Sequence, residues 1–220
     1  LSRDPHSAWY SDGRYGWQTQ FWTTPFSGFR WAVPEQCGWQ GQAIYTDSDV
    51  IFLADIGELW DQPFDPGKIV IAKGGQRYCV SKWDCAAAKR YLPPMSALRG
   101  DPYIHRGLMA RFKSLPHAVQ TFDKDADWNR LDLEGFELQD RRVKALHYTG
   151  IPTQLQLKHA VPRLAKEGRL HWYAGPRREH PRHDLQRLFD RLLIEAIRNG
   201  YDPDRNRKEP FGEYEIRAGR

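Results

Sequence analysis

The feature that most constrains the fold is a pair of aspartates inside an apolar stretch. Residues 42–46 have the composition of a β-strand, and the β-branched and aromatic pattern resumes at residues 50–53, after Asp47-Ser48-Asp49. Acids at positions i and i+2 lie on one face of a strand but about 6.6 Å apart, so both reach one cation most easily where the backbone turns. The segment therefore predicts a strand end with two carboxylates that need hydrogen bonds or a cation. A turn in which both side chains bind backbone amides is the alternative.

Strand and helix patterns alternate along the rest of the chain. Strands are expected at residues 68–72 and 143–147, and helices at 29–33, 55–60, 84–90 and 101–112, the first stopped near Pro34. Asp84 and Asp101 stand at expected helix starts. Apolar side chains follow helical spacing over residues 183–199, up to Gly200. The order predicts an α/β domain with a mixed sheet flanked by helices and a C-terminal amphipathic helix.

Composition narrows the class of protein. A chain of 220 residues, 40% of them hydrophobic, can bury a substantial core. We expect residues 1–170 to form the α/β core and residues 171–220 a basic C-terminal extension. The net charge of +5 favours an anionic partner. No apolar run reaches the roughly 18 residues that span a bilayer, and the first residues lack a signal-peptide pattern, so a soluble cytoplasmic protein is expected.

Three cysteines, Cys37, Cys79 and Cys85, lack the paired spacing of zinc or redox sites. They are expected to be reduced and mostly buried. A different pair, His180 and His183 beside Glu179, has a spacing too common to indicate a metal site.

A second motif follows the strand expected at residues 143–147. In His147-Tyr148-Thr149-Gly150 the imidazole can supply a nitrogen ligand, and Gly150 lets backbone approach a phosphate. Two carboxylates with one histidine, and open positions for diphosphate oxygens, suit Mn²⁺ somewhat better than Mg²⁺. A purely structural histidine is the alternative.

These stretches together resemble family 8 glycosyltransferases, which include glycogenins and lipooligosaccharide galactosyltransferases. The resemblance covers about residues 20 to 155 and is carried by Phe29-Arg30, by residues 41–50 with Asp47-Ser48-Asp49, by Asp55-Ile56-Gly57-Glu58-Leu59-Trp60 and by the motif at His147. It implies a GT-A fold, a Rossmann-like mixed sheet whose first β-α-β unit is here short or missing. It also implies a UDP-sugar donor, a carbohydrate or glycolipid acceptor, and transfer with retention of anomeric configuration.

The resemblance also assigns roles to residues. A Mn²⁺ or Mg²⁺ ion would be held by Asp47, Asp49 and His147. The nucleotide-sugar diphosphate would be contacted at Arg30, Ser48 and Gly150 as well as by the two acids. Arg30 and Asp101 would be catalytic, Arg30 beside the donor and Asp101 near the transferred sugar. A surface salt bridge for Arg30 and a helix cap for Asp101 are the alternatives.

Other functions stay open. A non-catalytic relative is possible because Thr153-Gln154-Leu155 stands where the family has Lys-Pro-Trp; Lys144 or Lys158 could substitute for that lysine. Asp127-Trp128-Asn129-Arg130-Leu131-Asp132 could bind the acceptor, with Trp128 equally suited to the core. The basic tail could bind nucleic acid or rest on an anionic membrane. Its candidate residues are Lys158, Arg163, Lys166, Arg169, Trp172, Tyr173, Arg177, Arg178 and Arg182.

Overall fold

The computed structural model describes residues 6, 9–10, 16–74, 77–166, 168 and 171–202. They fall into two compact units. The sheet unit comprises Gly13–Arg130 and Asp140–His147, and the C-terminal unit comprises Leu1–Asp12, Leu131–Gln139 and Tyr148–Arg220. The chain is an α/β protein with mixed sheets flanked by helices, as the alternating pattern predicts.

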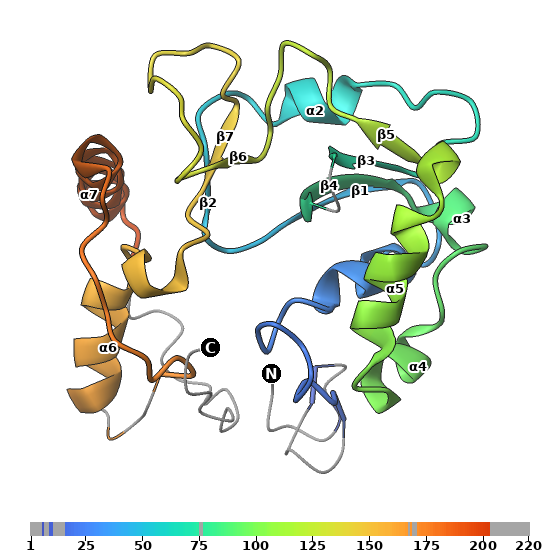
Figure 1. The fold of residues 1–220 in the computed structure, drawn as a ribbon, viewed down its shortest axis with the longest axis horizontal. Coiled ribbons are helices and arrows are strands. Elements are labelled where there is room, and N and C mark those ends of the chain that lie inside the picture. Colours follow the sequence, from blue (N-terminus) through green and yellow to red (C-terminus); the bar gives the residue numbers. More distant parts are fainter. Residues whose placement is uncertain are drawn as a thin grey trace. The chain divides into compact units, whose positions relative to one another are not determined.

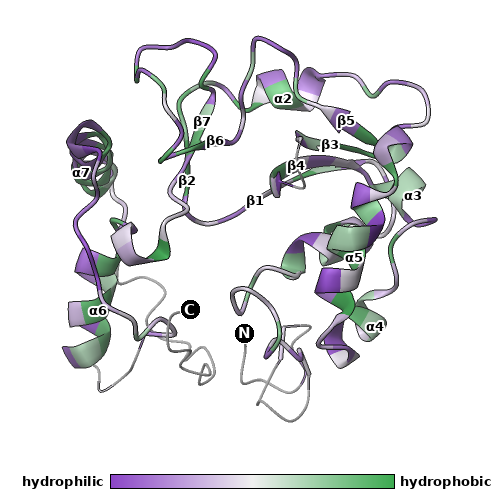
Figure 2. Ribbon diagram, in the orientation of Figure 1, coloured by the Kyte–Doolittle hydropathy of each residue, from purple (hydrophilic) through white to green (hydrophobic). Residues whose placement is uncertain are grey.

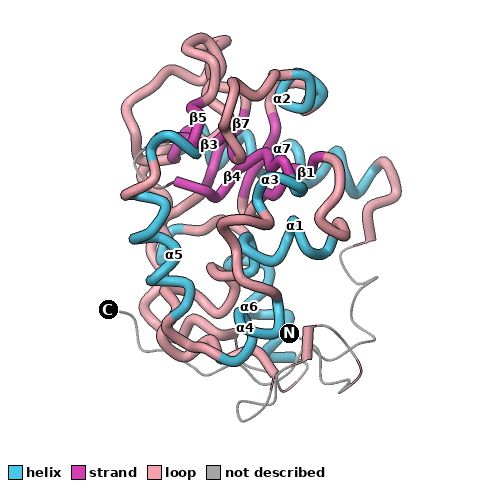
Figure 3. The backbone as a smooth tube through the Cα atoms, turned by 90° about the vertical axis from the view of Figure 1, so that its right-hand side faces the viewer, coloured by secondary structure: helices cyan, strands magenta, loops and turns pink. Residues whose placement is uncertain are grey.

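A four-stranded sheet forms the centre of the sheet unit (Figure 1). Its order is β1 (Gln42–Thr46), β4 (Arg77–Asp84), β3 (Val70–Lys73) and β5 (Val119–Thr121). β4 is antiparallel to both β1 and β3, and β5 is parallel to β3, so the sheet is mixed. Figure 3 shows β3, β4 and β5 side by side. Ile71, Ala72, Val80 and Trp83 are fully buried, which explains the apolar composition of these strands.

Helices cover this sheet on both sides. α2 (Gly57–Asp61) lies on one side, and α4 (Met95–Gly100) and α5 (Ile104–Lys113) lie on the other (Figure 1). α5 packs through Phe112, whose ring stacks on Trp31 with centroids 5.3 Å apart and meets Trp83 edge-on at 6.1 Å. Polar and apolar residues alternate along α5 (Figure 2), as a helix with one buried face requires.

Short helices complete the sheet unit. The helical segment before β1 runs through η1 (Phe29–Ala32) and α1 (Val33–Gln36). α3 (Cys85–Ala88) follows β4 directly, and Asp84 caps it by accepting from the amide of Ala87 at 2.9 Å. η2 (Pro116–Ala118) leads into β5.

A second, three-stranded sheet has the order β2 (Val50–Phe52), β7 (Ala145–His147) and β6 (Arg130–Leu131). β2 and β7 are antiparallel, with Val50 opposite His147. Both sheets contribute to one buried cluster, in which Val80 of β4 and Ala145 of β7 meet Leu59 and Trp128. Trp128 is therefore a core residue, 1% exposed.

The C-terminal unit contains η3 (Ile151–Thr153), α6 (Leu157–Lys166) and α7 (His183–Arg198). Leu185 and Leu188 of α7 are buried, and the carbonyl of Leu185 accepts from the Tyr148 hydroxyl at 2.9 Å. The last segment of this unit runs from Tyr148 to Arg220. Its first residue therefore differs from that of the expected extension, which starts at residue 171. The reason is that Tyr148 and α6 pack with α7.

The predicted elements are largely confirmed, with four differences. Pro34 lies in the first turn of α1 and does not stop the helix. In the first turn a backbone N–H has no partner within the helix, so a proline there loses no hydrogen bond. β2 belongs to a different sheet from β1, so the acids join two strands and do not interrupt one. The elements that were not expected are β4, β5, β6, α4 and α6. Among the cysteines, which are free, Cys85 is buried, Cys79 half-buried and Cys37 exposed.

None of the helices among the described residues combines the length and apolar character that crossing a bilayer requires.

Candidate metal and diphosphate site

The acidic pair lies where the chain crosses from one sheet to the other. The ladder between β1 and β4 continues one residue further, because the amide of Asp47 donates to the carbonyl of Cys79 at 2.8 Å. Ser48 and Asp49 then form a turn, and β2 begins at Val50. Ser48 is exposed, whereas the side chains of Asp47 and Asp49 are 21% and 18% exposed. A sheet edge at which the backbone turns thus carries two half-buried carboxylates.

Arg30 is the counter-ion of Asp47. Its Nη2 lies 3.3 and 3.2 Å from the two carboxylate oxygens, and the Arg30 side chain is only 7% exposed. Burial lowers the pKa of Arg30, but the charges of Asp47, Cys79 and Tyr45 and the hydrogen bond to Cys79 together outweigh it, and the net shift is upward. The alternative, a surface salt bridge, is therefore wrong in one respect, because Arg30 is buried and Asp47 is half-buried.

Tyr45 adds a second donor to Asp47. Its hydroxyl lies 2.5 Å from Oδ1, and its ring lies under the Arg30 guanidinium at 5.6 Å. Burial raises the pKa of Tyr45, and the Asp47 charge raises it further. The phenol therefore stays protonated and remains a hydrogen-bond donor.

His147 faces the acids because of the strand register. Since Val50 pairs with His147, the residue before Val50 is adjacent to the imidazole, and Nε2 lies 3.1 Å from Asp49 Oδ1 and 4.0 Å from Asp47 Oδ2. On its other side, Nδ1 lies 2.9 Å from Asn129 Oδ1. Burial lowers the pKa of His147, but its hydrogen bonds to Asp49 and Cys79 and their charges raise it to about 10.

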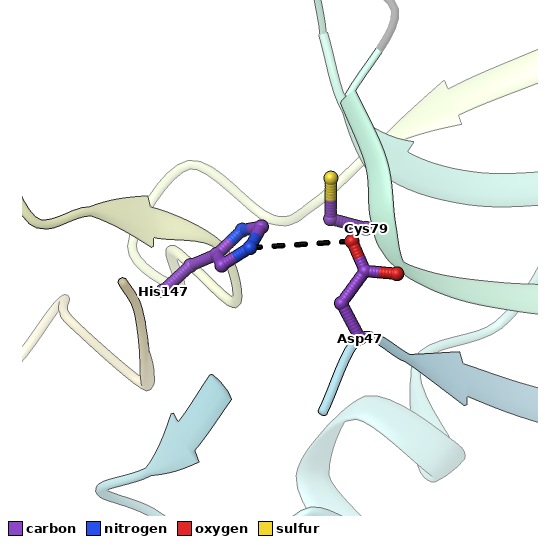
Figure 4. Close-up of side chains that lie close together, drawn as sticks. All are labelled: Asp47, Cys79 and His147. Carbon is purple, nitrogen blue, oxygen red and sulfur yellow. Dashed lines mark ion pairs between the residues drawn. The ribbon is translucent and has the colours of Figure 1, made fainter. Parts of the chain in front are cut away.

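Cys79, on β4, supplies a further potential ligand. Its sulfur accepts from Arg30 Nη1 at 3.5 Å. Figure 4 shows Cys79, Asp47 and His147 turned toward one another, and one ligand atom from each lies within 4.8 Å of the other two. Cys79 was not predicted as a site residue, because β4 was not expected. The alternation of Tyr78, Val80 and Lys82 with Cys79 and Ser81 was the available signal.

The donor set fits a divalent cation with an anionic ligand. Carboxylates and an imidazole are ligand types that divalent cations bind in proteins. In addition, two buried donors in this cluster, Arg30 Nε and Asn129 Nδ2, have no hydrogen-bond partner among the described residues. Buried donors normally have one, so both are available to a ligand oxygen. A cation at Asp47 would share that carboxylate with Arg30.

Four of the predicted site residues are thus brought together: Arg30, Asp47, Asp49 and His147. Asp101 is not among them. It is exposed, and its Oδ1 accepts from the amide of Tyr103 at 2.8 Å, ahead of α5. This is the helix-start role that was the alternative, although the helix itself begins two residues later than a cap would place it. A role near the transferred sugar stays a prediction.

Gly150 belongs to the C-terminal unit. Its carbonyl accepts from the Thr153 hydroxyl at 2.9 Å, and a Cβ at this position would lie 2.5 Å from Thr153 Oγ1. The glycine is therefore explained by the tight turn of η3, and its contact with a phosphate stays a prediction.

The remaining candidates have structural partners. Asp127 pairs with Lys73 at 3.1 Å and with Arg130 at 2.9 Å. Lys144 pairs with Glu58, and Lys158 with Asp190. These ion pairs explain the three charged side chains, and no ligand is needed to do so.

His180 and Arg182 also have structural partners. His180 is buried and its Nε2 lies 3.0 Å from Asp132 Oδ2, whereas His183 begins α7. Arg182 pairs with Asp184. Arg169 and Glu167, which were part of the basic segment considered for nucleic acid, lie outside the described residues.

The fold and site together define an α/β protein with a carboxylate–imidazole cluster at the junction of two sheets. Comparison with family models, with curated proteins and with solved structures found no match.

Proposed function

We propose that the chain is a metal-dependent glycosyltransferase of the GT-A type, which moves a sugar from a UDP-sugar to a hydroxyl acceptor. One observation carries the proposal: Asp47, Asp49 and His147 converge at a strand end, with Nε2 of His147 3.1 and 4.0 Å from the two carboxylates. Cation sites of mixed oxygen and nitrogen ligands are suited to an ion that also binds diphosphate oxygens.

In this proposal Asp47, Asp49 and His147 hold Mn²⁺ or Mg²⁺, and Ser48 lies in the turn that faces the diphosphate. When bound, the ion supplies positive charge that stabilises the departing diphosphate. Asn129 accepts from Nδ1 and so directs Nε2 of His147 toward the acids. The exposed Ser48 leaves this side of the turn open to ligand.

Arg30 provides a second positive charge. Its guanidinium is held against Asp47 and Cys79, and its Nε is the unpartnered donor noted above. A fixed guanidinium stabilises charge that develops on a leaving diphosphate without reorganising. Because the Arg30 side chain is almost completely buried, it is held in one position, unlike a flexible arginine at the surface.

The reaction would break the bond between the sugar C1 and the diphosphate oxygen and form one between C1 and the acceptor oxygen. The acceptor proton passes to the departing diphosphate, and attack from the same face retains the anomeric configuration. Asp101 is proposed to contact the transferred sugar, and a carbohydrate or glycolipid to be the acceptor. Gly150 is proposed to approach the diphosphate.

The test is a screen of UDP-sugars for Mn²⁺-dependent donor hydrolysis, followed by variants. Asp47→Ala, Asp49→Ala and His147→Ala should each abolish turnover, while Asp65→Asn, an exposed acid elsewhere in the sheet unit, should not. Retained activity in all three alanine variants would refute the proposal. Mn²⁺ and UDP binding without hydrolysis of any donor would instead favour a non-catalytic relative.

An anionic membrane is proposed as an additional partner. α7 exposes Ile194 and Ile197. The same side of the helix carries three basic side chains, Arg187, Arg191 and Arg198, and two acids, Asp190 and Glu195. Apolar and basic residues on one helix suit an interface with acidic lipid. Salt-sensitive binding to vesicles with acidic lipid, but not to neutral vesicles, is expected. Equal binding to both would contradict it.

A further inference from the structure

Cys79 has no role in the proposed Mn²⁺ site, yet its thiol lies inside the cluster. One ligand atom each from Asp47, Cys79 and His147 lies within 4.8 Å of the other two (Figure 4). Asp49 does not belong to this group of three. A thiolate changes which ions a site prefers, because sulfur favours Zn²⁺ over Mn²⁺.

We propose that Asp47, Cys79 and His147 form a Zn²⁺ site that overlaps the proposed Mn²⁺ site. Cys79 replaces Asp49 as the third ligand, and the fourth position is left to water or a ligand oxygen, as in open zinc sites. The site itself does not depend on glycosyltransferase activity. Its consequence, that Zn²⁺ displaces Mn²⁺, rests on the proposed function.

The distances require only small movements. Zinc bonds of about 2.0 to 2.3 Å in a tetrahedron place neighbouring ligand atoms about 3.3 to 3.6 Å apart. His147 Nε2 and Asp47 Oδ2 are 4.0 Å apart, and the sulfur is within 4.8 Å of both groups. Side-chain rotations that move each ligand atom by less than one bond length bring the three atoms to these distances.

The imidazole is already oriented for a metal. Because the Asn129 amide oxygen only accepts hydrogen bonds, the Nδ1 that it contacts carries the proton. Nε2, on the side of Asp47 and Asp49, is then the ligand nitrogen. This arrangement is the usual support for zinc-bound histidines.

The charges also suit a dication bound by a thiolate. The Arg30 guanidinium contacts both the Cys79 sulfur, at 3.5 Å, and the Asp47 carboxylate, at 3.2 Å. Zinc binding forms the Zn–S and Zn–N bonds, while the thiol proton of Cys79 and the Nε2 proton of His147 leave to solvent. Asp47, Asp49 and the Cys79 thiolate then balance the dication and Arg30.

Co²⁺ is a spectroscopic probe of this site, because cobalt bound to thiolate gives a near-ultraviolet charge-transfer band. After Co²⁺ is added, we expect the band in the unaltered protein and its loss in Cys79→Ser. Asp49→Asn and Cys37→Ser should retain it. Titration should show Cys79→Ser lowering Zn²⁺ affinity by more than about 100-fold, because losing a ligand costs more than losing a partner that only orients a ligand. No band in the unaltered protein, or a band that survives Cys79→Ser, would overturn the proposal.

Alkylation gives a readout that needs no variant. Zn²⁺ should slow the reaction of Cys79 with iodoacetamide, measured by mass spectrometry, and Mn²⁺ should not; the exposed Cys37 serves as the internal control. Unchanged alkylation of Cys79 would contradict the site. Zinc protection without any Mn²⁺-dependent UDP binding would leave the zinc site intact and refute the proposed function, and the converse result would refute the zinc site alone.

Discussion

Asn129 Oδ1 lies 2.9 Å from Nδ1 of His147, and both side chains are buried. This contact joins the segment before β6 to the end of β7 and determines which imidazole nitrogen faces the acids. The two residues therefore act as one unit, in which Asn129 orients and His147 binds.

Replacing Asn129 should weaken metal binding without removing a ligand. We expect Asn129→Ala to lower Mn²⁺ affinity by about 10- to 100-fold, as loss of an orienting partner does. Asn129→Asp keeps an acceptor at Nδ1 and should lose less. Calorimetric titration of Mn²⁺ measures both variants. Unchanged affinity in Asn129→Ala would show that this contact does not orient the imidazole.

The buried pair of Arg30 and Asp47 should matter for stability as well as for binding. Asp47→Asn leaves the guanidinium without its counter-ion, and we expect a loss of about 3 kcal/mol of the free energy of unfolding. Replacing both residues, as Arg30→Met with Asp47→Leu, should restore much of it.

Urea denaturation measures these losses, with Asp65→Asn as the matched control, which should change stability by no more than about 0.5 kcal/mol. If Asp47→Asn and Asp65→Asn lower the free energy of unfolding equally, the pair of Arg30 and Asp47 contributes nothing to stability.

His105 should make the protein less stable in acid. Burial lowers the pKa of His105 to about 4, with Arg30 contributing, and its Nδ1 accepts from Trp31 Nε1 at 2.8 Å, which needs the neutral ring. The folded-state pKa is below the ordinary 6.5, so the unfolded chain binds more protons between pH 6.5 and 4. The stability from the neutral ring is present above pH 6.5 and is lost as the pH falls toward 4.

The size of this effect is up to about 3 kcal/mol. Urea denaturation at pH 7 and at pH 4.5 should show a larger loss in the unaltered protein than in His105→Gln, which cannot gain a proton. The same loss in both would assign the acid sensitivity to other groups.

The C-terminal unit should depend on Asp132. Its carboxylate lies 3.0 Å from His180 Nε2 and accepts from the amide and hydroxyl of Thr149 at 3.1 and 2.9 Å, and the Asp132 and His180 side chains are 1% and 0% exposed. We expect Asp132→Ala to cost about 3 kcal/mol, because it leaves three buried donors or acceptors without partners. Thermal unfolding followed by circular dichroism measures it. A midpoint equal to that of the unaltered protein would contradict this.

The sequence predicted what depends on neighbouring residues. β1 was predicted over its full length, the cap at Asp84 was correct, and α7 ends within a residue of its expected end. The carboxylates were expected at a strand end, where the structure has them. All of these follow from local patterns of strand composition, capping and helical spacing.

What was missed depends on pairing between distant segments. Cys79 enters the cluster because β4 pairs with β1, and Asn129 enters because its segment lies beside β7. The change of sheet between Asp47 and Val50 cannot be read from the apolar pattern, since strands of either sheet have the same composition. Burial of Arg30 depends on packing that no single segment encodes.

The most direct measurement of the central claim is UDP binding by calorimetry with and without Mn²⁺. We predict binding that requires Mn²⁺, that is lost in Asp49→Ala and His147→Ala, and that is unchanged in Asp65→Asn. UDP binding of equal strength without Mn²⁺, or retained in both alanine variants, would contradict the assignment of this cluster as a metal and diphosphate site.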